Sequence, residues 1–353
     1  MKNKFMLVVF LVLVLFPFVL SGCSQDNSSI QQTEGTNYYE FEPITDIKEG
    51  QPNVYAVLKV IKSEYWQEII DGLQAAGNLA KANVYVGGPA NESDWQIQDM
   101  LCEQAVANGA DAIILAACNS ANIGNELATL REKNIPVVLV DTIANSSDYD
   151  ICYMTDNLLG GAMAAKTMIE LLKENGVSEN EPASIAIQIA STSSQTIIDR
   201  LAGFNQYWAQ QAPKAWKVLD EVKTNGGDIE IATQNGFDLL KQYPDVKGMF
   251  SCNNGSTVGC ATSLLESNAK DVVIVGFDYS DAIAGLIADP DWKAATIVQK
   301  QYDMGFKGLI SALSILNGVD PTYKFIDTGV LVITHDNYKA YEEKKSKGKG
   351  GLS

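Results

Sequence analysis

Clusters of polar and aromatic residues follow the apolar runs of this sequence, and their side chains are of the kinds that bind hydroxyl groups. Carboxylates and amides accept or donate hydrogen bonds to hydroxyls, and an aromatic face can cover the apolar C–H side of a sugar ring. The clusters are residues 63–66 (Ser-Glu-Tyr-Trp), residues 118–120 (Cys-Asn-Ser), Asp141-Thr142, residues 191–194, Asn253-Asn254, Asp278 and Gln299. Together they indicate a pocket for a small, polar, sugar-like molecule.

Catalytic and metal-binding residues are scarce in the same sequence. His335 is the single histidine, which argues against a Ser-His-Asp triad and excludes a His-rich metal site. The cysteines beyond Cys23 lack Cys-x-x-Cys spacing, so we expect them to be small buried thiols. No GxxxxGK[ST] motif for binding phosphate follows an apolar run. We therefore expect no catalytic residue, no metal and no cofactor. An enzyme that uses Asp141 and Asp278 as an acid–base pair is the alternative.

Short apolar runs alternate with helical patterns through most of the chain, and this alternation predicts the elements that position the clusters. The runs at residues 112–116 and 137–140 are entirely apolar, as expected for strands of a parallel sheet covered on both faces. Repeated strand–helix alternation predicts an α/β fold with two doubly wound, Rossmann-like lobes. In such sheets ligands bind beyond the carboxyl ends of the strands, which is where the clusters lie.

The N-terminus has the order of residues that is typical of a secretory signal. Lys2 and Lys4 precede an apolar run at residues 5–19, which is short for a membrane span of ~20 residues. Leu20-Ser21-Gly22-Cys23 resembles a bacterial lipobox, which implies that residues 1–22 are a signal peptide and that Cys23 is lipidated. An uncleaved N-terminal anchor is the alternative. Both interpretations place the rest of the chain on the extracytoplasmic face of the cell membrane, attached only by its anchor.

Length and charge limit the possible partners. About 330 residues would remain after cleavage, enough for two domains of ~100–200 residues each. The chain has 26 Lys and Arg against 43 Asp and Glu, a net charge of −17. Nucleic acid and anionic lipid headgroups repel such a chain, so we expect no nucleic-acid partner, and a neutral or cationic ligand suits it better than an anionic one. Residues 23–51 and 341–353 are polar, and we expect a lipid-anchored flexible tether and a frayed tail there.

The order and spacing of several segments are similar to the ribose-binding-protein-like branch of the type I periplasmic binding proteins. The resemblance extends from about residue 53 to residue 337, nearly the whole mature domain. It is carried by residues 63–66, 109–114, 134–137 before Asp141, 156–161, 200–204, 275–278 and 295–299. The resemblance implies two lobes joined by a three-strand hinge, a monomer, and binding of a sugar or polyol between the lobes without chemistry on it.

The same resemblance implies where the lobes begin and end. The N-terminal lobe is expected to comprise residues 52–155 plus 300–325, and the C-terminal lobe residues 156–299 plus 326–340. The chain would then cross between the lobes near residues 155–156, 299–300 and 324–326. We expect Tyr65, Trp66 and Asp141 in one lobe, and Arg200, Asn253 and Asp278 in the other.

Roles for individual side chains also follow from the resemblance. Tyr65 and Trp66 match the aromatic pair that encloses the ligand, and Asp141 matches a carboxylate that accepts hydrogen bonds from hydroxyls. The polar set of the second lobe is Arg200, Asn253, Asp278 and Gln299. Three positions depart from the pattern: Ser63 stands in place of an amide, Thr142 in place of an arginine, and Gly227 near a third aromatic ring. These departures change the size and donor count of the pocket, which argues against D-ribose itself as the ligand.

Structural roles remain open for the same residues. Tyr65 or Trp66 could belong to the hydrophobic core, and Arg200 could form a structural ion pair with Asp199 or Asp278. Asp141, Asp278 and Asn253 could cap helices. Asp156 and Asn157 are expected to mark a crossing between the lobes and a helix cap.

Two functions use a cleft of this kind. The first is a solute receptor that delivers a sugar-like ligand to an ABC transporter permease. The second is a sensor that presents the liganded form to a membrane histidine kinase or chemoreceptor. The predicted anchor serves both. A gene regulator of the related repressor type is excluded by the export signal and by the missing DNA-binding module.

Overall fold

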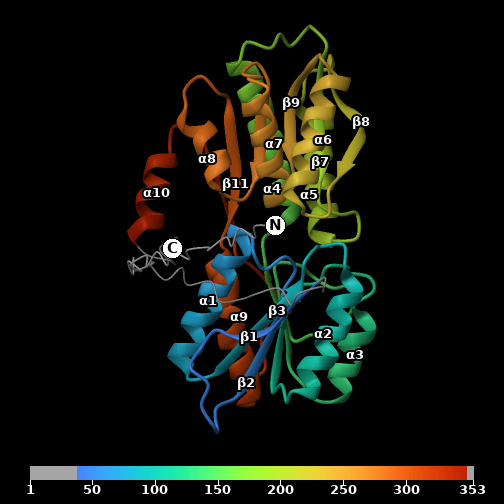
Figure 1. Ribbon diagram of the computed structural model, residues 1–353. Coiled ribbons are helices and arrows are strands. Elements are labelled where there is room, and N and C mark those ends of the chain that lie inside the picture. Colours follow the sequence, from blue (N-terminus) through green and yellow to red (C-terminus); the bar gives the residue numbers. More distant parts are fainter. Residues whose placement is uncertain (1–37, 348–353) are drawn as a thin grey trace, which may run out of the picture.

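The computed structural model describes residues 38–347, which form two α/β lobes stacked end to end (Figure 1). Each lobe contains one sheet of mostly parallel strands with helices on both faces. The prediction of an α/β fold with two doubly wound lobes is confirmed. The expected signal peptide and Cys23 lie outside the described residues.

The first lobe is built around one sheet. Its strands are β1 (Tyr38–Pro43), β2 (Asn53–Val57), β3 (Asn83–Pro89), β4 (Ala112–Leu115), β5 (Val137–Val140), β6 (Ile151–Met154) and β12 (Phe325–Asp327). Its helices are α1 (Glu64–Ala80), α2 (Trp95–Ala107), α3 (Gly124–Glu132) and α9 (Gln301–Leu316). The strand order is β1-β3-β2-β4-β5-β6-β12, and only β1 runs antiparallel among the described strands of this sheet. α1 and α9 cover one face, and α2 and α3 cover the other.

The second lobe repeats this plan. Its strands are β7 (Ala183–Ile189), β8 (Trp216–Thr224), β9 (Val246–Ser251), β10 (Val273–Phe277), β11 (Ala294–Gln299) and β13 (Val330–Ile333). Its helices are α4 (Asn157–Glu174), α5 (Gln195–Gln211), α6 (Ile229–Gln242), α7 (Asn254–Glu266), α8 (Asp281–Ala288) and α10 (Tyr338–Lys347). The strand order is β13-β11-β10-β9-β7-β8, with β13 antiparallel to β11. α4 and α5 cover one face, while α6, α7, α8 and α10 lie on the other.

The apolar runs form the central strands because both faces of each sheet are covered. β4 reads Ala-Ile-Ile-Leu and β5 reads Val-Val-Leu-Val, and all eight residues are buried. Successive side chains of a strand point to opposite faces. Ile114 accordingly packs into the core beneath α1 and α9, while Ile113 packs into the core beneath α2 and α3. A polar residue in either run would face a helix on one side or the other.

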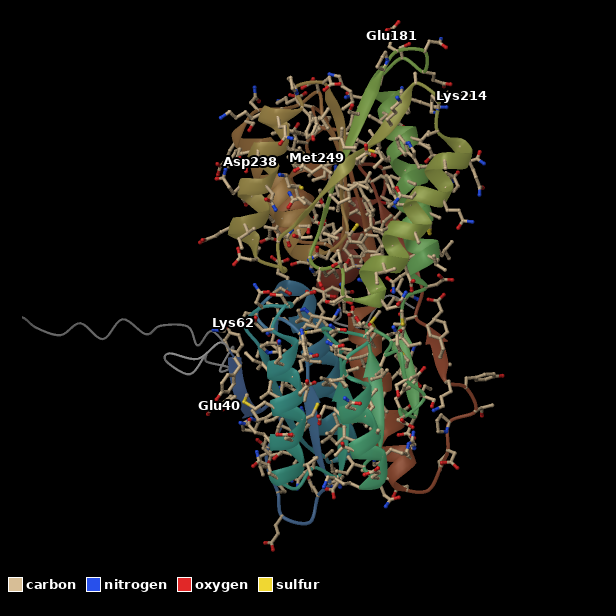
Figure 2. All side chains as sticks on the ribbon, turned by 90° about the vertical axis from the view of Figure 1, so that its right-hand side faces the viewer. Glu40, Lys62, Glu181, Lys214, Asp238 and Met249 are labelled. Atoms are coloured by element: carbon tan, nitrogen blue, oxygen red, sulfur yellow. The ribbon has the colours of Figure 1, made fainter. Side chains whose placement is uncertain are left out.

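The direction of the strands brings their carboxyl ends to the boundary between the lobes. Glu181 and Lys214 precede β7 and β8, and they lie at the end of the second lobe that is farthest from the first (Figure 2). Lys62 follows β2 and lies near the lobe boundary in the same view. The clusters that follow the strands therefore face one another across this boundary.

The backbones of α4 and α5 touch, and this contact positions one residue of the site. A Cβ atom on Gly161 would lie 2.0 Å from the carbonyl oxygen of Arg200, and one on Gly203 would lie 2.0 Å from that of Leu158. Only glycine permits this approach. The start of α4 is fixed by Asp156, whose Oδ1 accepts a hydrogen bond from the Leu159 amide at 3.0 Å. Arg200 is thereby held at the end of α4 that adjoins the first lobe.

The chain passes between the two sheets three times. It passes from β6 to α4 through Thr155 and Asp156, and returns from β11 to α9 at Lys300. The third passage lies between β12 and β13, at Thr328 and Gly329. The crossing expected at residues 324–326 is therefore wrong, as is the lobe boundary at residue 325, because β12 pairs with β6 in the first sheet. β12 is short and only partly buried, so it lacks the apolar run by which the other strands were recognised.

Both ends of the described chain contain structure that the sequence did not suggest. The tether expected over residues 23–51 is wrong for residues 38–43, which form β1. This strand pairs with β3 and buries Tyr39 in the core of the first lobe. The tail expected from residue 341 is also wrong at its start, since Tyr341 lies in α10. The Tyr341 ring packs on the Tyr279 ring, with centroids 4.7 Å apart. In both segments a few aromatic residues anchor an otherwise polar stretch. Within residues 38–347, no helix is long and apolar enough to cross a membrane.

Candidate ligand-binding cleft

A cleft between the lobes collects most of the side chains that the sequence singled out. The empty space between its walls, including the part that is open to solvent, is about 420 Å³. Its lining includes eight of the predicted residues: Ser63, Tyr65, Trp66, Asp141, Arg200, Asn253, Asp278 and Gln299. A larger surface hollow, of about 1160 Å³, lies between α4 and the end of β13 in the second lobe alone. The carboxyl ends of the strands meet at the cleft and not at this hollow, so the cleft is the candidate site.

Asp141 is the centre of the first-lobe side of the cleft. It follows β5 in the left-handed backbone region, with a φ of 63°. Its Oδ1 accepts a hydrogen bond from the Tyr65 hydroxyl at 2.5 Å, and its Oδ2 accepts one from the Thr142 hydroxyl at 2.5 Å. The same Oδ2 lies 3.2 Å from Lys59 Nζ, and both side chains are almost fully buried. Asp141 caps no helix; it organises three neighbouring side chains.

The ion pair with Lys59 keeps both groups charged. Burial alone would raise the pKa of Asp141, but Lys59, Arg200 and the two hydroxyl donors outweigh it, so the pKa lies below its usual value. Burial would lower the pKa of Lys59, but the carboxylates of Asp141 and Glu92 hold it above its usual value. A buried cation and carboxylate therefore face each other beside the cleft.

Tyr65 and Trp66 belong to the core and to the cleft at the same time. Both are buried among the side chains between α1 and the first sheet, and their rings meet edge to face with centroids 5.1 Å apart. Both also line the cleft. Trp66 therefore provides an apolar wall, while the Tyr65 hydroxyl is engaged with Asp141. Ser63 caps α1, the helix that carries them: its Oγ accepts a hydrogen bond from the Trp66 amide at 3.4 Å.

Arg200 is the main donor of the second-lobe side. Its Nε donates to Asn157 Oδ1 at 2.8 Å, its Nη1 donates to the Cys252 carbonyl at 2.7 Å, and its guanidinium lies 4.0 Å from the centroid of the Phe277 ring. Among residues 38–347, no ion pair within 4 Å joins it to Asp199 or Asp278. Its buried Nη2 has no partner in the described chain. Three contacts thus orient the guanidinium and leave Nη2 for a ligand.

Asp278 is the counterpart of Asp141 in the second lobe. It follows β10, again with a left-handed φ, of 69°. Its Oδ1 accepts a hydrogen bond from Gln299 Nε2 at 2.8 Å. Burial raises the pKa of Asp278 to about 7, although Arg200 and Gln299 oppose the shift. The buried Gln299 Oε1 and Asn254 Nδ2 are without a partner in the part of the chain that the structure describes, so this side offers both donors and acceptors.

Two predicted residues have supporting positions. Thr142 is fully buried and bonds to Asp141 and to the Thr196 hydroxyl, 2.9 Å away. It is not among the residues that line the cleft, and its predicted contact with the ligand stays a prediction. Asn253 begins α7, but its side chain makes no capping hydrogen bond and accepts one from Ser256 instead. Asn157, which was expected at the lobe crossing and a helix cap, also accepts the hydrogen bond from Arg200 Nε.

Sequence reasoning missed two charged residues of the cleft, Lys59 and Glu92. Lys59 lies in the largely apolar stretch at residues 53–61, whose pattern predicts a single strand. The strand ends at Val57, so Lys59 belongs to the loop that follows it. Glu92 lies three residues after the end of β3 at Pro89, in a loop of small and polar residues. The detectable signal was a lysine within an otherwise apolar run.

Hydrogen bonds between the lobes close the cleft on the side away from the hinge. The Glu92 amide donates to the Gly226 carbonyl at 3.1 Å, and the Ser120 amide donates to the Ser193 carbonyl at 3.2 Å. Thr196 Oγ1 of the second lobe donates to the Asp141 carbonyl at 3.1 Å. Gly227 lines the cleft beside Glu92. It is the position near which the family pattern has a third aromatic ring. The structure is therefore the closed arrangement of the two lobes.

The remaining cysteines and acidic residues form no metal site in the described chain. Cys102, Cys118, Cys152, Cys252 and Cys260 are buried and unpaired. Residues 38–347 contain no group of three or more His, Cys, Asp or Glu side chains that could hold a metal ion.

Two stacked α/β lobes with a polar cleft between them define a class of binding proteins. The family model for the periplasmic binding protein domain matches residues 54–320. The chain belongs to this family, in the ribose-binding-like branch of the type I periplasmic binding proteins, which are sugar-binding transport proteins and not enzymes.

Relatives and solved structures agree with this assignment. The ribose import binding protein of Bacillus subtilis is 23% identical over 313 residues, which cover 88% of this chain and 93% of that protein. The ribose import binding protein of Haemophilus influenzae is 28% identical, over 76% of this chain and 87% of its own length. The carbohydrate transporter solute-binding protein of Agrobacterium radiobacter, in complex with D-arabinose, has a TM-score of 0.78 and 25% identity, covering 84% and 98% of the two chains. The ABC transporter solute-binding protein of Agrobacterium vitis with bound D-fucose has a TM-score of 0.75 and 29% identity, covering 83% and 98%.

Proposed function

We propose that this protein is a lipid-anchored, extracytoplasmic receptor that captures a small sugar or polyol between its lobes and delivers it to an ABC importer. The observation that carries the proposal is the closed cleft, in which each lobe supplies hydrogen-bonding groups and the first lobe adds the Trp66 wall. Arg200 Nη2, Asn254 Nδ2 and Gln299 Oε1 are buried polar atoms with no partner in the described chain. Such atoms carry a desolvation penalty unless a ligand satisfies them. The names of the relatives, which import ribose or hold D-arabinose and D-fucose, support a sugar.

Both halves of the cleft come from one chain, which supports a monomer as the working unit. A ligand that touches both lobes must favour the closed arrangement, since only there do its contacts with both lobes form together. An importer could distinguish the liganded receptor by this closed shape. Delivery to an importer is supported by the transport roles in the names of the relatives.

A screen of pentoses, hexoses and polyols by thermal unfolding tests the function. A true ligand should stabilise the folded protein by ~2.7 kcal/mol at one hundred times its dissociation constant. Small-angle scattering should then report the more compact, closed form when that ligand is present. A screen in which no sugar or polyol raises the unfolding temperature would contradict the proposal.

The pH at which the screen is run matters because of Asp278. Its pKa of about 7 reflects burial, opposed by Arg200 and Gln299 and reinforced by Asp141. A ligand hydroxyl that donates to Asp278 binds the ionised carboxylate. We therefore expect the affinity for the ligand to fall as the pH drops from 8 to 6. The limiting slope, reached well below the pKa of Asp278, is about tenfold per pH unit. Asp278→Asn should weaken binding and abolish this pH dependence, as measured by calorimetry.

The anchor rests on Cys23, which lies outside the described residues. Cys23→Ser removes the sulfur that a lipid would acylate, so the variant should leave the membrane fraction and lose the mass of the lipid. Fractionation and mass spectrometry of both forms check this. Unchanged membrane attachment of the variant, with no lipid on the wild type, would indicate an uncleaved N-terminal anchor instead.

A further inference from the structure

The charged residues that line the cleft do not balance. Three are carboxylates, Glu92, Asp141 and Asp278, and two are cations, Lys59 and Arg200. Burying a charge is unfavourable unless an opposite charge and hydrogen bonds accompany it. The question is therefore which carboxylate lacks a partner when the lobes are closed.

Asp141 and Asp278 each have donors close by. Asp141 holds Lys59 at 3.2 Å and accepts hydrogen bonds from two hydroxyls. Lys59 Nζ also donates to Ser194 Oγ at 3.3 Å, so it is engaged on both sides. Asp278 accepts a hydrogen bond from Gln299, and the positive charge of Arg200 acts on it. Asp141 is therefore paired with Lys59, and Asp278 has a hydrogen-bond donor and lies in the field of Arg200.

Glu92 is the carboxylate that remains. No hydrogen bond or ion pair of its carboxylate is found within residues 38–347, although its backbone amide bonds to Gly226 of the other lobe at 3.1 Å. A Cβ atom on Gly227 would lie 3.2 Å from Glu92 Cγ, so the side chain lies against the second lobe where the lobes meet. Burial raises the pKa of Glu92 despite the nearby charge of Lys59. The Glu92 side chain is thus only partly buried, and its carboxylate faces the cleft with no protein donor in the described chain.

We infer that the cleft selects a sugar or polyol that carries a protonated amine, and that Glu92 is the residue that recognises the amine. The inference rests on the proposed function and narrows its ligand class. A neutral hydroxyl can donate a hydrogen bond to Glu92 but leaves the excess negative charge in place. An ammonium group supplies both the donors and the missing charge, and charge-assisted hydrogen bonds are the stronger kind. Glu92 lies at the closing side of the cleft, so the amine seals the lobes together.

Matched pairs of ligands test the inference by calorimetry. The pairs are D-glucosamine with D-glucose, D-galactosamine with D-galactose, and D-glucamine with D-glucitol. The N-acetyl amino sugars serve as a further control, because they keep the nitrogen and lose the charge. The wild type should bind at least one amine about tenfold or more tightly than its neutral partner, equivalent to ~1.4 kcal/mol. This preference should disappear for the N-acetyl form and at a pH above the pKa of the amine.

Two variants assign the preference to a residue. Glu92→Gln keeps the shape and removes the charge, so the amine and its neutral partner should bind it about equally. Glu132→Gln makes the same change at an exposed position of the same lobe and should retain the wild-type ratio. Neutral sugars that bind as well as or better than the amines, or a preference that survives in Glu92→Gln, would overturn the inference while leaving the sugar receptor intact. Binding of no member of either class would contradict the proposed function as well.

Discussion

Arg200→Ala should weaken ligand binding by about 10- to 100-fold or more. The side chain is 2% exposed and lines the cleft, and its Nη2 has no partner in the described chain. Losing a charge-assisted hydrogen bond in a closed cleft leaves the ligand hydroxyl without a donor, which costs ~1–3 kcal/mol of binding free energy. Each ~1.4 kcal/mol corresponds to a tenfold change in affinity. Isothermal titration calorimetry with the ligand from the sugar screen measures the effect.

Two further variants make the Arg200 result interpretable. Arg131→Ala is the control. It removes an arginine that forms a surface ion pair with Asp150 at 3.0 Å, so the variant should bind the ligand like the wild type. Trp66→Ala should also weaken binding, in this case because it removes an apolar wall of the cleft. Since Arg200 also bonds to Asn157 and to the Cys252 carbonyl, circular dichroism melts must show that the variant is folded. Wild-type affinity in both folded cleft variants would mean that the ligand binds elsewhere.

Asp141→Asn should destabilise the protein by about 3 kcal/mol, because it leaves Lys59 buried without its carboxylate. Removing one partner of a buried ion pair typically costs ~3–5 kcal/mol. We expect the lower end of that range, since Lys59 lies beside a cleft that admits water when the lobes open. The pair lies within the first lobe, so its loss acts on folding and not only on closure. Urea unfolding, with the midpoint and slope compared between variants, gives the free energy of unfolding.

The double variant Lys59→Met with Asp141→Asn separates a lost attraction from a stranded charge. If the stranded ammonium is responsible, removing it should recover much of the stability, because no uncompensated charge then stays buried. Asp303→Asn is the control, since it breaks an exposed pair with Lys307 at 2.8 Å and should change stability by about 0–1 kcal/mol. An unfolding midpoint of Asp141→Asn equal to that of the wild type would show that Lys59 needs no buried counter-ion.

Much of the site could be predicted because strand ends in a doubly wound sheet converge. Asp141 follows β5 and Asp278 follows β10, and each apolar run showed where its strand would stop. Thr142 illustrates the limit of this reasoning. The residue after Asp141 is as close to the strand end as Asp141 itself, but its side chain turns inward and bonds to Thr196. Adjacency in sequence does not determine which of two neighbouring side chains faces the cleft.

Segments without an apolar run were the least predictable. β1 and β12 were missed because edge strands bury few side chains, so their residues carry little periodic signal. Tyr39 and Tyr341 are single aromatic anchors whose partners lie far away in the chain. Glu92 was missed for another reason, because it lies three residues beyond β3 and not directly at the strand end.

The sequence by itself determined the class of fold, the position of the cleft at the strand ends and the polar character of its lining. These properties follow from local patterns, since burial on both faces requires continuous apolar runs and the residues after them must face the other lobe.

Only the tertiary structure decided how the charges pair. Lys59 and Asp141 are 82 positions apart in the chain, but Lys59 Nζ lies 3.2 Å from Asp141 Oδ2. Arg200 is oriented by Asn157 from a neighbouring helix, and Glu92 is left without a counter-ion when the lobes close. Such pairing depends on distances between side chains that lie far apart in the chain, and packing of the whole molecule sets those distances.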